Sequence, residues 1–109
     1  MAFTQKRLAG PAAMNTSATD IYTVPSLTTT IVKQIMLCNT DASTARTATL
    51  HVAASGSVAA GNTIFKAISL DPNETVILNL SLVLAAGEKI SGLASNAAVT
   101  ITISGIEEA

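Results

Sequence analysis

The stretch Thr30-Ile31-Val32-Lys33-Gln34-Ile35-Met36-Leu37-Cys38-Asn39 is a mostly apolar run around which the other segments of the chain can be arranged. It opens with β-branched residues and closes in a turn cluster, Asn39–Ser43. Its length is that of a long strand and is well short of the roughly 20 apolar residues that cross a membrane. Lys33 and Gln34 in its middle also argue against a membrane span. The run predicts a central strand with both faces mostly covered.

The segments around this run alternate between apolar and polar residues, most plainly in Val99–Ile106. A period of two places alternate side chains on opposite faces of a strand. Clusters of Asn, Asp, Pro and Gly separate the segments, as turns require. The expected strands are residues 20–24, 30–39, 46–53, 63–70, 75–82, 88–94 and 99–106, and the expected core residues are Ala48, Leu50, Val52, Ile64, Ile68, Leu70, Val76, Leu78, Leu80, Leu82, Ile90, Val99, Ile101 and Ile103.

Turn signals recur about every 8 to 12 residues, which is typical of a sandwich or a small barrel. No window shows sustained helical periodicity. The sequence therefore predicts an all-β fold, an antiparallel β-sandwich of jelly-roll or immunoglobulin-like topology with about seven or eight strands.

The chain has 109 residues, which is one domain. Residues 1–18 are expected to form an extended N-terminal arm and residues 19–109 the sandwich. The arm carries Lys6 and Arg7 and no acidic residue before Asp20, so it is a candidate docking element; a frayed terminus or an edge strand is the alternative. The candidate interaction residues are Phe3, Lys6, Arg7, Leu8, Pro11 and Met14.

Charge is scarce in this chain. Charged residues make up 12% of it, the formal net charge is -1, and aromatic residues make up 3%. No basic field exists to attract nucleic acid or an anionic membrane. Soluble monomers depend on surface charge, so a surface of small uncharged residues favours self-association or burial against a larger body. We expect a homo-oligomer, with a trimer favoured.

Candidate catalytic and metal-binding residues are few. His51 is the only histidine and Cys38 the only cysteine, which excludes an internal disulfide and a histidine-rich metal site. We expect a structural or solvent-facing His51 and an inert buried Cys38. Asp41 and Asp71, with neighbouring asparagines, could offer oxygen ligands to Ca²⁺, but their spacing fits no calcium loop. The sequence predicts no enzyme, no cofactor and no metal.

Other sequence motifs are also missing. Met1–Arg7 leads into no apolar region, so we expect no signal peptide. The small-residue loop Ser55–Asn62 has neither the spacing of a dinucleotide fingerprint nor that of a phosphate-binding loop. The aromatic residues available to stack on bases or sugars are Phe3, Tyr22 and Phe65. Tyr22 is expected to pack half-buried with a wet hydroxyl.

Four segments together resemble a family of small virion proteins of tailed bacteriophages. They are Ile21–Pro25, Ile31–Thr40, Leu82–Ile90 and Val99–Glu107, and the likeness spans residues 20–107. Its motifs are turn and core signatures, so they point to a fold more than to an activity. The resemblance implies a β-sandwich that builds or coats the virion, and it assigns no functional residue.

From this resemblance and the composition we expect a non-enzymatic virion protein assembled in the bacterial host cytoplasm. The leading expectation is a capsid decoration (cement) protein that stabilises the head by bridging subunits of the major capsid protein. A tail, neck or fibre-associated module is the alternative, and a glycan-binding host-attachment module is a third. No nucleic acid or membrane partner is expected.

Overall fold

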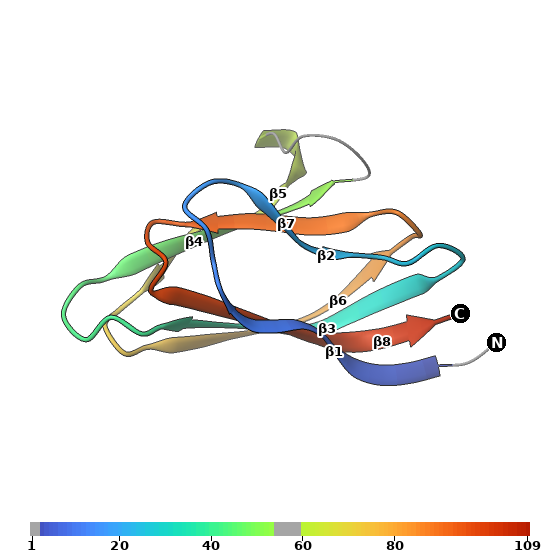
Figure 1. Cartoon of the computed structure of the whole chain (residues 1–109), viewed down its shortest axis with the longest axis horizontal. Helices are drawn as coiled ribbons and strands as arrows, with labels where there is room; N and C mark the ends of the chain where they lie inside the picture. The colour runs from blue at the N-terminus through green and yellow to red at the C-terminus, as the bar shows by residue number, and fades with distance from the viewer. Residues whose placement is uncertain (1–2, 54–59) are drawn as a thin grey trace.

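Eight strands form two four-stranded sheets that face each other, as the computed structural model shows (Figure 1). The structure describes residues 3–53 and 60–109. Sheet A has the strand order β1-β8-β3-β6 and sheet B the order β2-β7-β4-β5. The elements are β1 (Phe3–Ala13), β2 (Thr19–Thr23), β3 (Thr29–Asn39), β4 (Arg46–Ala53), the 3-10 turn η1 (Ala60–Asn62), β5 (Thr63–Leu70), β6 (Thr75–Leu84), β7 (Lys89–Ala94) and β8 (Val99–Glu108).

The pairing follows one rule: β1 pairs with β8, β2 with β7, β3 with β6 and β4 with β5, always antiparallel. The chain is therefore one long hairpin that is rolled up, so that alternate strand pairs fall in opposite sheets. This is the jelly-roll arrangement. The predicted antiparallel sandwich is confirmed, and the strand order is the jelly-roll one of the two topologies that the sequence left open.

The expected strands lie within two residues of those observed. Boundaries were predictable because turn residues occupy most connections: Asn73 has φ +62° and Gly87 has φ +85°. Positive φ values suit glycine, which has no Cβ, and asparagine, whose short polar side chain tolerates the left-handed region. The Ser55–Asn62 loop lies mostly outside the described residues, which resume at η1.

Strand β3 is central in sheet A, between β8 and β6. Its inward residues Val32 and Ile35 are both fully buried although they are three positions apart. Register shifts between Val32 and Gln34 on both neighbouring strands explain this spacing, since a bulge at Lys33 changes which side chains face inward. The central position was predicted correctly, whereas the outer face of β3 is half-buried rather than covered.

The core lies between the sheets and is made almost wholly of aliphatic residues. Leu50, Ile35 and Ile103 have no exposed surface, and the alternating apolar residues of β6 pack against the cluster while staying partly exposed. Burying side chains of this size contributes roughly 1.5–3 kcal/mol each. The buried core residues are Met14, Tyr22, Val24, Val32, Ile35, Leu37, Ala48, Leu50, Leu70, Leu84, Ile90, Ala94, Val99, Ile101 and Ile103.

The expected N-terminal arm differs from what is observed. Residues 3–13 form β1, an edge strand paired with β8 from Phe3 to Ala13. No boundary at residue 18 therefore separates an arm from the sandwich. The reason is local: β1 has a kinked course with register shifts near Gly10, whose φ is +74° and whose Cα lies so close to Ile101 that a Cβ would meet its carbonyl oxygen. Glycine allows the strand to stay in the sheet there.

The start of β1 and the end of β8 lie at the end of the molecule that holds the chain termini (Figure 1). The turns β3–β4, β5–β6 and β7–β8 lie at the opposite end of the 47 Å long axis. Within the described residues, no helix is long and apolar enough to cross a membrane.

Candidate interaction surfaces

The candidate interaction residues on β1 fall into two groups. Phe3 is 69% exposed, and Lys6, Arg7 and Pro11 are also exposed. These four are accessible to a neighbouring molecule. The other two candidates belong to the sandwich itself.

Leu8 packs partly buried against the core, and Met14 is 3% exposed within it. The Met14 backbone N–H also donates to the Val99 carbonyl at 2.8 Å. The Met14 side chain is therefore part of the core, and the Leu8 side chain is only partly accessible. The sequence missed this because the bulges near Gly10 change which residues of β1 face inward, and such irregularities leave no clear alternation to read.

Glu107 joins three other strands at the end of the sandwich that holds the termini. Its carboxylate accepts a hydrogen bond from the Tyr22 hydroxyl at 2.5 Å and an ion-paired one from Lys6 Nζ at 3.1 Å. Since the single Tyr22 proton goes to the carboxylate, the Thr30 hydroxyl 2.8 Å away donates to the Tyr22 oxygen. The expected wet hydroxyl is therefore held between β8 and β3.

The groups of this cluster shift one another's pKa values. The hydrogen bond from Tyr22 holds the pKa of Glu107 below its usual value, and Lys6 acts in the same direction against the effect of burial. Burial first, and then the hydrogen bond to Glu107, raise the pKa of Tyr22 to about 12. Nothing in the local sequence shows that Glu107, near the end of the last strand, pairs with Tyr22.

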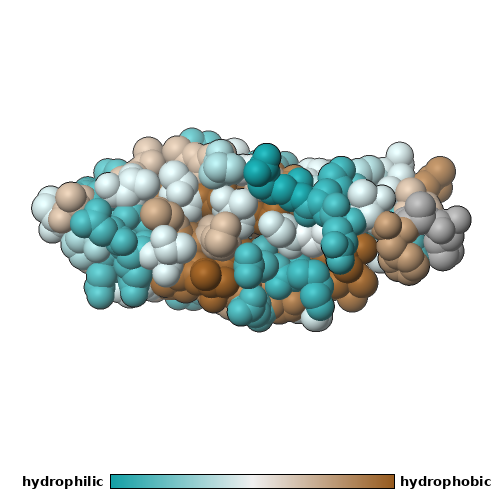
Figure 2. Space-filling model, turned by 90° about the horizontal axis from the view of Figure 1, so that it is seen from below, coloured by the Kyte–Doolittle hydropathy of each residue, from teal (hydrophilic) through white to brown (hydrophobic). Residues whose placement is uncertain are grey.

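The outer face of sheet A carries apolar side chains in cross-strand rows. Ile106, Ile31 and Val83 form one row, and Met36 and Ile77 lie side by side in another. Val83 is 63% exposed and Ile77 is 52% exposed. Figure 2 views the molecule from this side and shows apolar areas between polar side chains. Such a face suits contact with another protein surface.

Two hollows lie next to these surfaces, one between β1 and β2 and one on sheet A. A crevice of about 160 Å³ lies between the edges β1 and β2, and its lining includes three alanines and two glycines. It is smaller than the roughly 300 Å³ at which ligand pockets begin. An open depression of about 500 Å³ lies on sheet A. No aromatic side chain lines it; its residues are Gln5, Lys6, Lys33, Ser104, Gly105 and Ile106.

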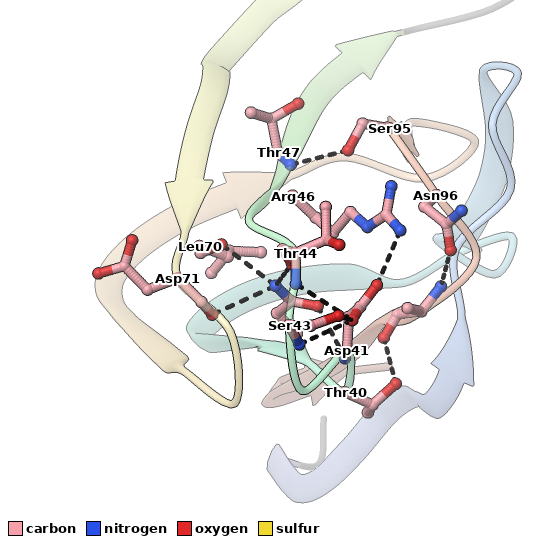
Figure 3. Close-up of polar contacts among 12 residues, drawn as sticks. Thr40, Asp41, Ser43, Thr44, Arg46, Thr47, Leu70, Asp71, Ser95 and Asn96 are labelled. Atoms are coloured by element: carbon pink, nitrogen blue, oxygen red, sulfur yellow. Dashed lines mark hydrogen bonds and ion pairs between the residues drawn. The ribbon is translucent and has the colours of Figure 1, made fainter.

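Polar contacts of Asn39 and Asp41 hold the opposite end of the sandwich. Figure 3 shows those of Asp41 with Ser43, Thr44 and Arg46. The buried Asn39 amide lies within hydrogen-bond distance of the carbonyls of Thr44, Leu70 and Asp71, at 3.0 to 3.2 Å. Its Oδ1 accepts from the Asp41 N–H at 3.0 Å. One side chain thus ties the β3–β4 loop to the β5–β6 turn.

Asp41 was considered as a calcium ligand, but its oxygens already have partners. Oδ1 accepts from the backbone N–H groups of Ser43 and Thr44, and Oδ2 accepts from Arg46 at 2.7 Å. The Ser43 N–H and Arg46 together lower the pKa of Asp41 to about 2. Among the described residues, no three His, Cys, Asp or Glu side chains gather as a metal site would require.

His51 faces outward in the register of sheet B, opposite Ser91, yet it is only 7% exposed. Its Nδ1 lies 3.2 Å from the Thr63 hydroxyl, and η1 contacts β4 nearby. The structural interpretation of His51 is therefore the appropriate one. Cys38 is half-buried on the outer face of sheet A, not fully buried as expected.

No family model matches this chain, and no curated protein matches its sequence. Two solved structures overlap it, each described as a pentameric capsid protein isolated from metagenomic phage sequences. They are 15% and 16% identical to it, with TM-scores of 0.42 and 0.41 over 97% of this chain. The chain spans 60% of the length of those proteins. Overlap this weak does not establish a shared fold or role.

Proposed function

We propose that this chain is a non-enzymatic structural protein of a bacteriophage virion, assembled in the host cytoplasm. Its favoured place is the head, as a decoration protein that bridges major capsid subunits. One observation carries the proposal: large apolar side chains stand exposed where the fold makes no use of them. They are Phe3, Leu27, Ile77 and Val83.

Leu27 is the clearest of these residues. It is 92% exposed, so its side chain contributes almost nothing to the core. It also has φ +57°, a left-handed conformation that costs a branched side chain about 1–2 kcal/mol. An asparagine or glycine would suit this turn better. A leucine that is both strained and exposed is accounted for by contact with a partner.

The register of sheet A relates Phe3 to the turn that holds Leu27. The register places Phe3 beside Glu108 on β8, and Glu108 beside Thr29 at the start of β3. Thr29 is two residues from Leu27. The two exposed apolar side chains therefore belong to the same end of the sandwich, which gives a neighbouring subunit two anchors. Apolar anchors of this kind dominate the energy of protein interfaces.

Scarce charge supports the same proposal. With 12% charged residues and a net charge of -1, the surface repels copies of itself only weakly. A subunit repeated many times on a shell needs this property. We propose a homo-oligomer on the same ground; the trimer favoured from sequence stays a prediction.

The jelly-roll topology is compatible with this role, since jelly rolls build viral capsid domains. They also build lectin domains, and a fold alone does not assign a function. The glycan-binding alternative lacks an aromatic platform within the described residues. Tyr22 is in the core and Phe65 is partly buried, which leaves Phe3 as the exposed aromatic.

Docking by the N-terminus cannot be tested by deletion, because β1 is part of the sandwich. Deleting residues 2–14 would remove β1 and uncover Ile101 and Ile103, which it covers, so the truncated chain would not keep an intact sandwich. Side-chain substitutions avoid this problem. Phe3→Ser and Leu27→Asn remove the exposed anchors and leave the core unchanged, and Thr4→Ser, at an exposed site on β1, is the matched control.

The test is to add the purified chain to particles that lack it and to reconstruct their image. Density in clusters on the icosahedral shell, lost with Phe3→Ser and Leu27→Asn but kept with Thr4→Ser, is the expected result. Density confined to the neck, tail or fibres would replace the decoration role with the tail-associated alternative. A melting temperature that rises with a saccharide, without binding to particles, would favour host attachment instead.

A further inference from the structure

Strand β6 is a free edge of sheet A. On one side it pairs with β3, from Thr30–Leu84 to Cys38–Thr75. On its other side no strand of the described residues is hydrogen-bonded to it. In an antiparallel ladder every second residue of such an edge points its N–H and C=O groups outward. Strand β6 therefore offers a ten-residue template for another strand.

The other three edges are protected in ways that natural sheets use against such pairing. Strand β1 carries Lys6 and Arg7 together with Pro11 and register shifts. Strand β2 has five residues, one of which is Asp20. Strand β5 carries Lys66, followed by a residue with positive φ.

Strand β6 has none of these protections except one register shift opposite β3. Of the eight described strands it is the one without a charged residue, and it contains no proline. Its sequence, Thr75-Val-Ile-Leu-Asn-Leu-Ser-Leu-Val-Leu84, is rich in residues that favour strands. An edge of this kind persists in a soluble protein when a partner covers it.

We infer that β6 pairs antiparallel with β6 of a second copy about a twofold axis at Leu80. The inference rests on the proposed function and names the contact between copies. A twofold axis at Leu80 places Ile77 of one copy opposite Val83 of the other, since both lie three positions from the centre. These are the two exposed large apolar residues of the strand. Cross-strand pairs of this kind stabilise a sheet.

The remaining pairs agree with the same register. Asn79 meets Ser81 on the outer face, so that polar residues pair with each other. On the inner face Leu78 meets Leu82, and Leu80 meets its own copy. These inner residues are only partly buried in the single chain, so a second copy completes their coverage. The two sheets then form one continuous sheet, β1-β8-β3-β6 followed by β6-β3-β8-β1.

A second copy is favoured over a foreign strand because the edge carries no charge to select an oppositely charged partner. The nearest charge is Lys33 on β3, whose Nζ donates to Ser81 at 3.0 Å. In the dimer the two Lys33 residues would be three strand spacings apart, about 14 Å. That exceeds the screening length of about 8 Å at physiological salt, so they do not oppose pairing.

The test is sedimentation of the full chain over a range of concentrations, with variants that add charge to β6. Ile77→Lys and Val83→Glu should each weaken dimerisation at least about tenfold, since each places two unpaired charges in the contact. Both substitutions in one chain should restore the dimer, because each lysine then faces a glutamate of the other copy. Within one chain the two positions are too far apart to pair. Thr4→Lys on the exposed part of β1 is the matched control.

A disulfide gives a second measurement. Leu80→Cys in a Cys38→Ser background should form a covalent dimer under mild oxidation, because position 80 lies on the axis. A wild-type chain that stays monomeric at millimolar concentration overturns the inference. So does a dimer or trimer that Ile77→Lys and Val83→Glu leave unchanged, or one that the double substitution fails to restore.

These results are separable from those on the function. A β6-mediated dimer that binds no particle would overturn the virion role and leave the contact standing. A monomer that binds shells would do the reverse. Circular dichroism and melting temperature of each variant show that the sandwich is folded, so loss of the dimer is not loss of the fold.

Discussion

The Tyr22 hydroxyl donates a hydrogen bond to the Glu107 carboxylate at 2.5 Å, which joins β2, an edge strand of sheet B, to β8 of sheet A. The two residues are 85 positions apart in the chain. With Thr30 and Lys6 they close the end of the sandwich beside the termini.

Replacing Tyr22 with Phe removes the hydroxyl and keeps the ring. Thr30 and Glu107 both lose a partner in a buried or part-buried site, so we expect a loss of about 1–3 kcal/mol in unfolding free energy. Urea denaturation measures it. Thr23→Ala, an exposed change on the same strand, should be nearly neutral. Equal stability of the Tyr22→Phe variant and the wild type would contradict the role given to this bond.

The same pair predicts how stability depends on acid. The pKa of Glu107 is lowered from 4.5 in the folded chain, so the unfolded chain binds more protons as the pH falls. The stability contributed by Glu107 is complete above about pH 5. It is lost as the pH falls through 4.5 and then through the folded value. Melting temperatures from pH 6 to pH 3 should show this loss, with a smaller slope in Glu107→Gln.

At high pH the sign reverses for Tyr22. Its folded pKa is raised from 10.0 to about 12, so the folded chain keeps a proton that the unfolded chain releases. Stability from Tyr22 is complete below pH 10 and is lost between pH 10 and about 12. Ultraviolet titration of the phenolate gives a direct measurement, since Tyr22 is the only tyrosine. A midpoint near 10 in the folded chain would show that the hydroxyl is not held.

Among the polar residues at the end of the sandwich opposite the termini, Asn39 should contribute most to the free energy of unfolding. Asn39→Ala leaves the buried carbonyl of Leu70 and the Asp41 N–H without this partner. Each unsatisfied buried group costs about 1–3 kcal/mol, so the expected loss is at least about 2 kcal/mol. Ser69→Ala on exposed β5 is the control. Hydrogen exchange should localise the loosening to residues 40–45, and exchange spread evenly over the chain would count against it.

Gly105 and Gly61 differ in the space around an added Cβ atom, so alanine substitutions at the two positions can be compared. A Cβ at Gly105 would lie 2.3 Å from the Ile31 carbonyl oxygen, where the bulge of β3 brings the backbones together. A Cβ at Gly61 meets nothing within 4 Å. We expect Gly105→Ala to lose about 1–3 kcal/mol and Gly61→Ala to change stability little. Thermal melting of both variants checks this, and similar melting temperatures would mean that the close approach does not limit the site.

Leu27→Asn should leave stability unchanged or raise it by up to about 1 kcal/mol. The change removes a side chain that is 92% exposed and places a residue suited to positive φ in the turn. Denaturation midpoints measure the effect, with Thr23→Ala as the control. A marked loss of stability would mean that Leu27 serves the fold, and its exposure would no longer support docking.

Local sequence patterns are sufficient to predict the strands and the sandwich. Alternation in Val99–Ile106 and turn residues at Asp71–Glu74 act over short distances, so they can be recognised without knowing the partner strands. The scarcity of charge can also be recognised from the sequence alone. It supports the expectation that this protein binds copies of itself or a larger body.

Which residues contact each other across the sandwich could not be predicted from these local patterns. The bulge at Lys33 reverses the facing of β3 partway along the strand, and the kinks of β1 bring Met14 into the core, because a one-residue shift exchanges the two faces of a strand. The pairing of Tyr22 with Glu107 and the free edge of β6 depend on how the rolled hairpin aligns distant strands. Strand order is a property of the whole chain, and local patterns do not encode it.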